Sequence, residues 1–392
     1  MSRTTFVLSS LAALLSTAAC VDEPGTLPPL PATPSGAQLA VATSDFQTGA
    51  LHSVDLSTFS VRRNIDVVDA QPVVRGFGSQ VYVLDQTHGT ARIYDAAQNF
   101  AAPRELSFGQ APNVPAAQTN PYDIYIDSDR KQAYVTLYGS FGSTVINGDR
   151  ALGVVDLTQP QAGIARFVPL PVAAGDSDQN PDATRLSACG DTLYVLLQDL
   201  DRTTYAPVGP GRLAAVSLRD NAVRIIPLAG ENPTALVVLP GCREAIVGSA
   251  GDQLSAALTG KSGIERVDLT TGQTGGLILK DSDLGGNVST LDAVSTRDVF
   301  VDVSRRTGMR YDNDVYLVDA VTGQRGQKLL GSIKFVPALR VVGQRLVVLA
   351  AGTPDAGQLP AGLYLGPADG QSLPATPIDF GLPPVSSDLY TR

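Results

Sequence analysis

The chain has 392 residues, of which 17% are charged, 38 are Gly and 27 are Pro, so many turns are expected. Its formal charge is −9 with no cluster of basic residues, which argues against nucleic acid as a partner and against electrostatic attraction to an anionic membrane. Only two histidines occur, His52 and His88, which excludes mechanisms that need several imidazole groups.

Residues 1–19 are interpreted as a signal peptide. Arg3 supplies a positive charge, and the apolar run that follows is too short to span a bilayer and ends in small residues before Cys20. The stretch STAAC resembles the lipobox of bacterial lipoproteins, in which cleavage leaves a lipidated N-terminal cysteine. The resemblance implies a lipid anchor on Cys20 and a place in the bacterial cell envelope, where we expect the outer membrane. The alternative is an ordinary signal peptide in which the cysteine is accidental.

Residues 20–37 are expected to form a tether that begins at the lipidated cysteine. Five prolines lie between residues 21 and 37. Such a segment is extended and semi-rigid, and it would hold a folded domain away from the membrane.

From residue 38 to residue 392 the pattern predicts β-structure, because short alternating apolar runs are separated by Gly, Asp, Asn and Pro. An apolar strand that ends in Asp and a turn, such as LHSVDLSTF at 51–59, occurs in seven copies at intervals of 40 to 61 residues. Each copy follows another strand, most have a third strand before that, and a fourth comes after the turn. Four-stranded antiparallel units with this period predict a seven-bladed β-propeller.

The two ends of the chain are predicted to close the ring. The first unit begins at its second strand, LAVAT at 39–43, whereas the segment VSSDLYTR at 385–392 resembles the opening strands of other units. We expect this segment to join the first blade, which would remove an open sheet edge. A frayed tail is the alternative. The last unit is expected to have four strands, ending near residues 376–380.

The repeats AYVTLYG at 133–139 and VVDLT at 154–158, with their sister repeats, resemble the YVTN-type propellers of exported bacterial proteins, in the WD40-like superfamily. The resemblance covers about residues 38–392 and implies the seven-bladed fold. It implies little about function, because the group includes binding modules, scaffolds and a few enzymes. The Gly-His and Trp-Asp pairs typical of WD40 repeats are absent from the sequence.

The remaining cysteines, Cys189 and Cys242, each precede the second strand of their unit, in blades four and five. Equivalent turns of adjacent blades are neighbours, and an export signal implies an oxidising compartment. A disulfide between them is therefore expected, with two free thiols as the alternative.

One face of the propeller is expected to carry the function. The loops between the second and third strands are short in blades one and two and long in blades three to seven, and long loops on a rigid scaffold tend to carry binding residues. The candidate ligand-binding residues on this face are Tyr138, Asp199, Tyr205, Arg305, Arg306, Arg310 and Tyr311. The last four form a basic, aromatic loop tip that could grip an acidic partner or a glycan; a solvated loop is the alternative.

Four carboxylates are candidates for a calcium site, because each is expected near the start of a channel-lining strand: Asp123, Asp182, Asp292 and Asp388. Such a site would resemble that of metal-dependent propeller lactonases, although the Glu of those enzymes is missing from these strands. The alternative is that the carboxylates are solvated or cap turns. The Asp of the repeated VDL motif is interpreted as a turn residue that bonds its own backbone.

The sequence therefore predicts a membrane-anchored scaffold that needs no cofactor and binds a protein, peptide or glycan with its long-loop face. A calcium-dependent hydrolase or lactonase is the alternative.

Overall fold

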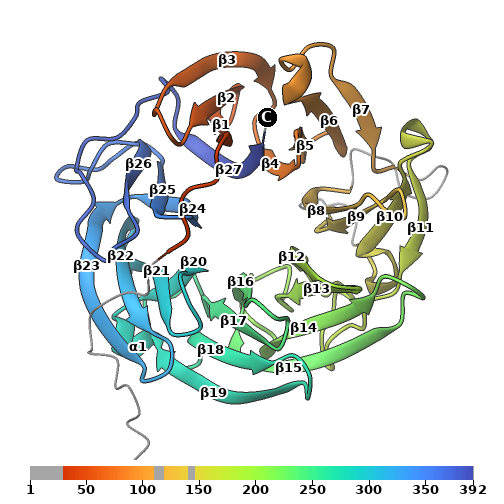
Figure 1. Ribbon diagram of the computed structural model, residues 1–392. Helices are drawn as coiled ribbons and strands as arrows, with labels where there is room; N and C mark the ends of the chain where they lie inside the picture. The colour runs from red at the N-terminus through yellow and green to blue at the C-terminus, as the bar shows by residue number, and fades with distance from the viewer. Residues whose placement is uncertain (1–29, 110–118, 140–145, 392) are drawn as a thin grey trace, which may run out of the picture.

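The structure, a computed structural model, describes residues 30–109, 119–139 and 146–391. The predicted signal peptide at 1–19, Cys20 and the residues of the predicted tether up to 29 lie outside the described residues. Described strands β1 to β27 form seven antiparallel sheets that stand side by side in a ring (Figure 1). The predicted all-β, seven-bladed propeller is therefore confirmed.

The first four blades contain these strands, given from the innermost outward. Blade one has β27 (Pro384–Thr391), β1 (Ala37–Ser44), β2 (Gly49–Asp55) and β3 (Val61–Val68). Blade two has β4 (Pro72–Phe77), β5 (Gln80–Asp85), β6 (Thr90–Asp95) and β7 (Arg104–Ser107). Blade three has β8 (Pro121–Asp127), β9 (Gln132–Leu137), β10 (Leu152–Asp156) and β11 (Ile164–Val168), and blade four has β12 (Ala183–Cys189), β13 (Thr192–Leu197), β14 (Pro210–Ser217) and β15 (Val223–Glu231).

The other three blades complete the ring. Blade five has β16 (Pro233–Val238), β17 (Glu244–Ser249), β18 (Gly263–Asp268) and β19 (Gln273–Lys280), and blade six has β20 (Asn287–Ala293), β21 (Asp298–Thr307), β22 (Arg310–Asp319) and β23 (Gln324–Ile333). Blade seven has β24 (Phe335–Val342), β25 (Arg345–Ala351) and β26 (Gly362–Pro367). Short helical turns are η1 (Ala96–Gln98), η3 (Gly148–Arg150), η4 (Pro160–Ala162) and α1 (Asp281–Leu284). No helix in these described segments is long and apolar enough to cross a membrane.

The predicted closure by the C-terminal segment is confirmed. Strand β27 pairs with β1 in antiparallel register, with Leu389 opposite Leu39, and lies inside blade one (Figure 1). The Tyr390 hydroxyl lies 2.5 Å from Ser53 Oγ. Ser53 belongs to β2, so this hydrogen bond connects the last strand to the strand beyond β1. Gly76 of blade two approaches this strand so closely that a Cβ there would lie 1.7 Å from the Leu389 carbonyl oxygen.

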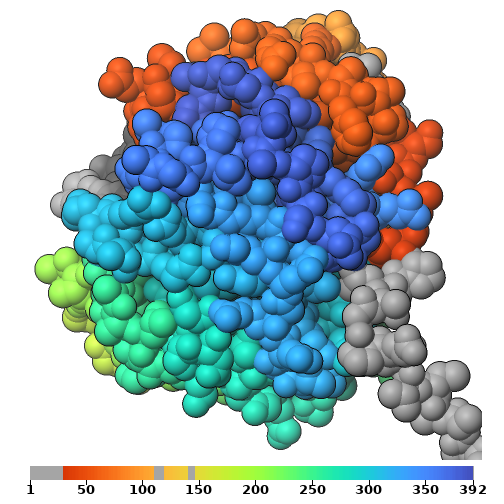
Figure 2. All heavy atoms as spheres, turned by 90° about the vertical axis from the view of Figure 1, so that its left-hand side faces the viewer, coloured from red at the N-terminus to blue at the C-terminus, as the bar shows by residue number. Residues whose placement is uncertain are grey.

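The prediction of a full fourth strand in blade seven was wrong. Residues after β26 contribute only an isolated bridge, in which Ile378 and Leu363 exchange backbone hydrogen bonds of 2.8 and 3.0 Å. Pro374 and Pro377 both precede Ile378, and proline has no N–H to donate to a strand ladder. The segment that follows β26, dark blue in Figure 2, instead covers the outer side of blade seven.

The hydrophobic core lies between neighbouring sheets, because the strands alternate and each sheet packs against two others. Side chains of the second and third strands supply most of it, for example Leu39, Val135, Leu196 and Val347, all with 0% exposure. The turns on one face are closed by the repeated Asp, as predicted. Asp268 Oδ1 accepts hydrogen bonds from the N–H groups of Thr270 and Thr271 at 2.8 and 3.0 Å.

The predicted disulfide is also confirmed. Cys189 at the end of β12 and Cys242 in the turn before β17 are bonded, with their Cα atoms 5.8 Å apart. The bond joins blades four and five on the face that carries the short turns.

Candidate functional site: a cavity in the long-loop face

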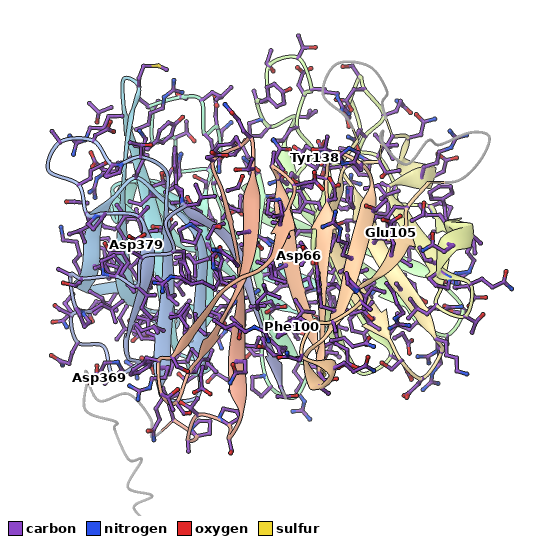
Figure 3. All side chains as sticks on the ribbon, turned by 90° about the horizontal axis from the view of Figure 1, so that it is seen from above. Asp66, Phe100, Glu105, Tyr138, Asp369 and Asp379 are labelled. Carbon is purple, nitrogen blue, oxygen red and sulfur yellow. A yellow bond between two sulfur atoms is a disulfide. The ribbon has the colours of Figure 1, made fainter. Side chains whose placement is uncertain are left out.

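The two faces of the ring differ. The connections from the second to the third strand and from the fourth to the next blade lie on one side, and we call this side the loop face. In Figure 3, Tyr138 lies inside the ring close to the loop face, whereas Phe100 and Asp369 lie near the opposite, short-turn face. The predicted lopsided placement of the loops is thus seen in the structure.

A cavity of about 1190 Å³ opens on the loop face and continues down between the innermost strands. Its mouth is formed by residues of several loops, including Phe46, Gln86, Tyr205, Leu254 and Thr353. The deeper wall comes from strands β4, β8, β12, β16, β20, β24 and β27. The volume lies somewhat above the range of typical ligand pockets, which is about 300–1,000 Å³.

Three arginines line this cavity, one each from blades two, four and seven. The Arg75 side chain is buried and forms an ion pair with Asp123; burial lowers the pKa of Arg75, but Asp123 offsets this and the net shift is upward. Arg340 Nη2 lies 3.7 Å from Asp388 Oδ1. The Arg185 guanidinium lies over the Tyr122 ring, 5.5 Å from its centroid, and makes no ion pair with any residue in the described segments.

Three of the four predicted calcium ligands instead connect neighbouring blades. Asp123 Oδ2 accepts a hydrogen bond of 2.9 Å from Leu186 N, Asp292 Oδ2 accepts one of 2.7 Å from Val341 N, and Asp388 Oδ2 accepts one of 3.1 Å from Gly76 N. Each N–H belongs to the innermost strand of the next blade. Thr234 makes a similar link, because its Oγ1 donates to Val288 O at 2.9 Å.

The three arginines stand directly before these bonded N–H groups in the sequence. Arg75 precedes Gly76, Arg185 precedes Leu186 and Arg340 precedes Val341. An Asp on one innermost strand thus fixes the backbone beside an Arg on the next. The same hydrogen bonds that hold the blades together also position the guanidinium groups in the cavity wall.

Asp182, the fourth predicted ligand, has a different environment. It is 3% exposed, immediately precedes β12 and accepts a hydrogen bond of 2.7 Å from Leu200 N. Burial raises the pKa of Asp182 to about 8, and the nearby charges of Asp178 and Asp199 act in the same direction. Without a cation beside it, the Asp182 carboxyl group therefore favours its neutral form near pH 7.

The expected position of these residues also needs correction, since Asp292 is the penultimate residue of β20 and Asp388 is in the middle of β27. Within the described segments, the acidic and histidine groups that do converge are Asp69, Asp85 and His88, whose ligand atoms lie within 4.8 Å of one another. None of the four predicted ligands belongs to this group. Calcium binding stays a prediction from the sequence.

The predicted ligand-binding residues divide into two sets. Tyr138 and Tyr205 line the central cavity, and the Tyr138 ring packs 5.7 Å from that of Tyr122. Asp199 is fully buried and forms a two-pronged ion pair with Arg212, so it holds the loop of blade four together.

The other predicted residues lie in the hairpin of β21 and β22, whose strands are longer than expected and leave only Gly308 and Met309 in the turn. Arg305 pairs with Asp314, and Arg310 donates to both oxygens of Asp312 at 2.7 and 2.9 Å. Arg306 lies over the Tyr311 ring, 5.7 Å from its centroid, and donates to the Leu254 carbonyl oxygen. The positive charge of the predicted basic tip is thus largely compensated within the hairpin.

Exposed apolar side chains lie on the loop face. Among the described residues, we call five of them the apolar rim, of which the first three line the cavity: Phe46, Leu254, Phe335, Leu258 and Met309. Met309 is 87% exposed and Phe46 69%. On the short-turn face, Phe59 and Val321 are the exposed large apolar residues found in the described segments.

Sequence reasoning missed Arg75, Arg185, Arg340 and Tyr122. A signal for the arginines was present, because each is a charged residue within an otherwise apolar innermost strand: VVRGF, ATRLS and ALRVV. In a propeller, polar side chains of these strands face the central channel. No local pattern shows that Arg185 would meet Tyr122, which lies in another blade.

No protein-family model matches the chain, and no curated protein matches it. Among solved structures, it is similar to a chain of the mitotic checkpoint complex, with 11% identity, 89% of this chain and 96% of that chain covered, and a TM-score of 0.53. It is also similar to the computationally designed Ika8 protein, with 14% identity, coverage of 89% and 86%, and a TM-score of 0.51. A functionally unknown protein from Desulfotomaculum acetoxidans gives 11% identity, coverage of 87% and 94%, and a TM-score of 0.51. At these identities the similarities show the propeller fold alone.

Proposed function

We propose that this protein is an exported, lipid-anchored scaffold of the YVTN propeller type, and that its loop face binds a protein or peptide partner. The observation that carries the proposal is the apolar rim on the loop face. These exposed Phe, Leu and Met side chains come from several blades and lie on one face, and aromatic residues and Met are enriched at protein interfaces. The compensated charges of Arg305 and Arg310 favour such a partner over an acidic glycan.

The start of the described chain supports an anchored arrangement. Thr33 Oγ1 donates to Val342 O and Gln344 Nε2 donates to Leu30 O, each at 3.3 Å. Both contacts are made with the turn between β24 and β25, on the short-turn face. A tether that leaves from this face would leave the loop face directed away from the membrane and free to bind.

Site-specific photocrosslinking in the producing bacterium tests the partner proposal. A photoreactive phenylalanine analogue replaces Leu258 or Met309 on the apolar rim, and Val321 or Phe59 on the short-turn face as the matched control. We expect a discrete crosslinked protein from the rim positions and none from the control positions. Equal crosslinking from both faces, or none from the rim, would contradict the proposal.

A further inference from the structure

We propose that the central cavity binds an amphipathic carboxylate, whose anionic head is held by Arg185 and whose apolar body lies toward the mouth. This inference goes beyond the proposed function, because it concerns the cavity and does not require that the apolar rim binds a protein. It rests on the charge arrangement, the burial and the shape of the cavity.

Arg185 is the least compensated of the three cavity arginines. Arg75 has Asp123, and Arg340 has Asp388, whereas Arg185 has the face of Tyr122 and no carboxylate partner in the described segments. Burial lowers the pKa of Arg185, and the positive charges of Arg75 and Arg340 act in the same direction, whereas Tyr122 and Asp123 act in the opposite direction. Because the net shift is downward, the surroundings do not fully compensate the half-buried guanidinium, and an added anion would stabilise its charged form.

The surroundings of Arg185 suit a planar, two-oxygen anion. The guanidinium presents a flat fork of N–H donors that matches a carboxylate in bidentate geometry. The stack on Tyr122 and the hydrogen bond from Leu186 N to Asp123 hold the side chain and its backbone in place, so little ordering is needed on binding. The cavity lining also contains Asp45, Asp123 and Asp388, and the last two are paired with Arg75 and Arg340, which leaves Arg185 as the cavity arginine that forms no ion pair within the described segments.

The mouth of the cavity supplies an apolar environment for the remainder of the ligand. The cavity lining includes Leu200, Leu254, Phe46 and Phe335, together with Tyr138 and Tyr205. Pockets with many apolar side chains and a few fixed polar groups orient a ligand by its polar end. An aryl or alkyl carboxylic acid and the C-terminal carboxylate of an apolar peptide share this chemistry.

Matched pairs of acidic and neutral probes test the inference by isothermal titration calorimetry at low salt. The first pair is 4-phenylbutyrate and 4-phenylbutanol, and the second is acetyl-Ala-Ala-Phe with a free or an amidated C-terminus. We expect at least one acid to bind tenfold or more tightly than its neutral counterpart. A preference seen only with phenylbutyrate identifies a free carboxylic acid as the ligand, and one seen only with the peptide identifies a chain end. Equal affinity of acid and neutral probe in both pairs would overturn the proposal.

Variants locate the binding. Arg185→Gln should abolish the preference for the acid, Arg185→Lys should keep part of it because the charge remains without the fork, and Arg62→Gln, on the outer strand β3, should leave it unchanged. If Arg185→Gln does not fold, Leu254→Asp decides, because Leu254 is 53% exposed at the mouth and a carboxylate there should weaken binding of the acid while sparing the alcohol. A preference that persists in folded Arg185→Gln, or that Leu254→Asp leaves intact, would disprove the assignment.

Discussion

At the scale of single residues, His52 is the buried titratable group whose protonation state follows most directly from its contacts. It is 1% exposed, its Nδ1 accepts a hydrogen bond from Asn64 N at 3.4 Å, and its Nε2 lies 3.0 Å from Thr43 Oγ1. Because Nδ1 accepts, Nε2 carries the proton and donates to Thr43. Burial, with a contribution from the charge of Arg63, lowers the pKa of His52 to about 4.

This shift predicts a loss of stability in mild acid. Between pH 6.5 and about 4 the unfolded chain binds a proton at His52 that the folded protein does not, so the free energy of unfolding falls as the pH falls. The loss from this group amounts to about 3 kcal/mol at most. Urea unfolding at pH 7 and pH 4.5 should show a smaller fall for His52→Gln than for the wild type. The exposed His88→Gln variant serves as the contrast and should fall at least as far as the wild type, because the hydrogen bond to Asp85 raises the pKa of His88 and its loss removes a contribution that stabilises the folded state in acid. Identical pH dependence in all three proteins would refute the argument.

The bond between Asp123 and Arg75 predicts a large energetic effect. Asp123→Ala leaves the Arg75 guanidinium buried without its partner and leaves Leu186 N without an acceptor. Removing one member of a buried pair costs about 3–5 kcal/mol. The matched control is Asp268→Ala, which removes two hydrogen bonds from an exposed turn and should cost only about 1 kcal/mol. Chemical unfolding of both variants measures these losses. A similar loss in the free energy of unfolding for the two variants would contradict the prediction that the buried Asp123 contributes more than an exposed turn residue.

At the scale of elements, strand β27 closes the ring, and its removal should strongly destabilise the folded protein. Deleting residues 385–392 exposes the unpaired edge of β1 and removes the contacts of Leu389 and Tyr390 with blades one and two. One buried side chain of this size contributes about 1.5–3 kcal/mol, and a typical domain has only about 5–15 kcal/mol in total. The truncated protein should therefore melt far lower or aggregate.

The control for this deletion is loss of the same number of residues from the Pro-rich segment, at 21–28. It should leave the melting temperature nearly unchanged, because it stops short of the contacts of Leu30 and Thr33 with blade seven. Calorimetry of the two truncated proteins decides the matter. If both melt alike, the ring does not depend on β27.

Elements were predictable where their signal is local. The repeated Asp turn is closed by hydrogen bonds between residues of one four-residue segment, as between Asp268 and the N–H groups of Thr270 and Thr271. The alternation of apolar and polar residues also lies within a single strand, so each strand can be predicted without knowing its neighbours. Closure was predictable because the first unit lacks a strand and the tail resembles one. The prediction of a fourth strand in blade seven was wrong, since only an isolated bridge is present there. Pro374 and Pro377 were a signal in the sequence against a continuous strand.

The candidate site was less predictable because its contacts cross blades. Asp123 meets Leu186, and Arg185 meets Tyr122, across 63 residues of sequence in both cases. The period of the repeats says which strands line the channel, but the register between neighbouring innermost strands decides which side chains meet. For this reason the sequence does not show that Asp123, Asp292 and Asp388 accept hydrogen bonds between blades.

At the scale of the whole molecule, the position of the tether predicts how the propeller is oriented on a membrane. Leu30 is held against the turn between β24 and β25, and nine residues lie between it and Cys20. The ten Cα–Cα steps from Cys20 to Leu30 span at most about 36 Å. If Cys20 is lipidated, the short-turn face therefore stays near the bilayer while the apolar rim and the cavity mouth point away from it.

Fluorescence quenching on membrane vesicles tests this arrangement. A fluorophore is attached through Val321→Cys on the short-turn face or through Met309→Cys on the apolar rim, and a quencher is carried on lipid headgroups. We expect stronger quenching at position 321 than at position 309 in the lipidated protein. In the Cys20→Ser variant the protein should be released from membranes or remain unprocessed, because the acyl chains that would anchor it cannot be attached. A Cys20→Ser protein that is correctly cleaved and still sediments with membranes would disprove the anchor, whereas stronger quenching at position 309 would leave the anchor standing and reverse the orientation.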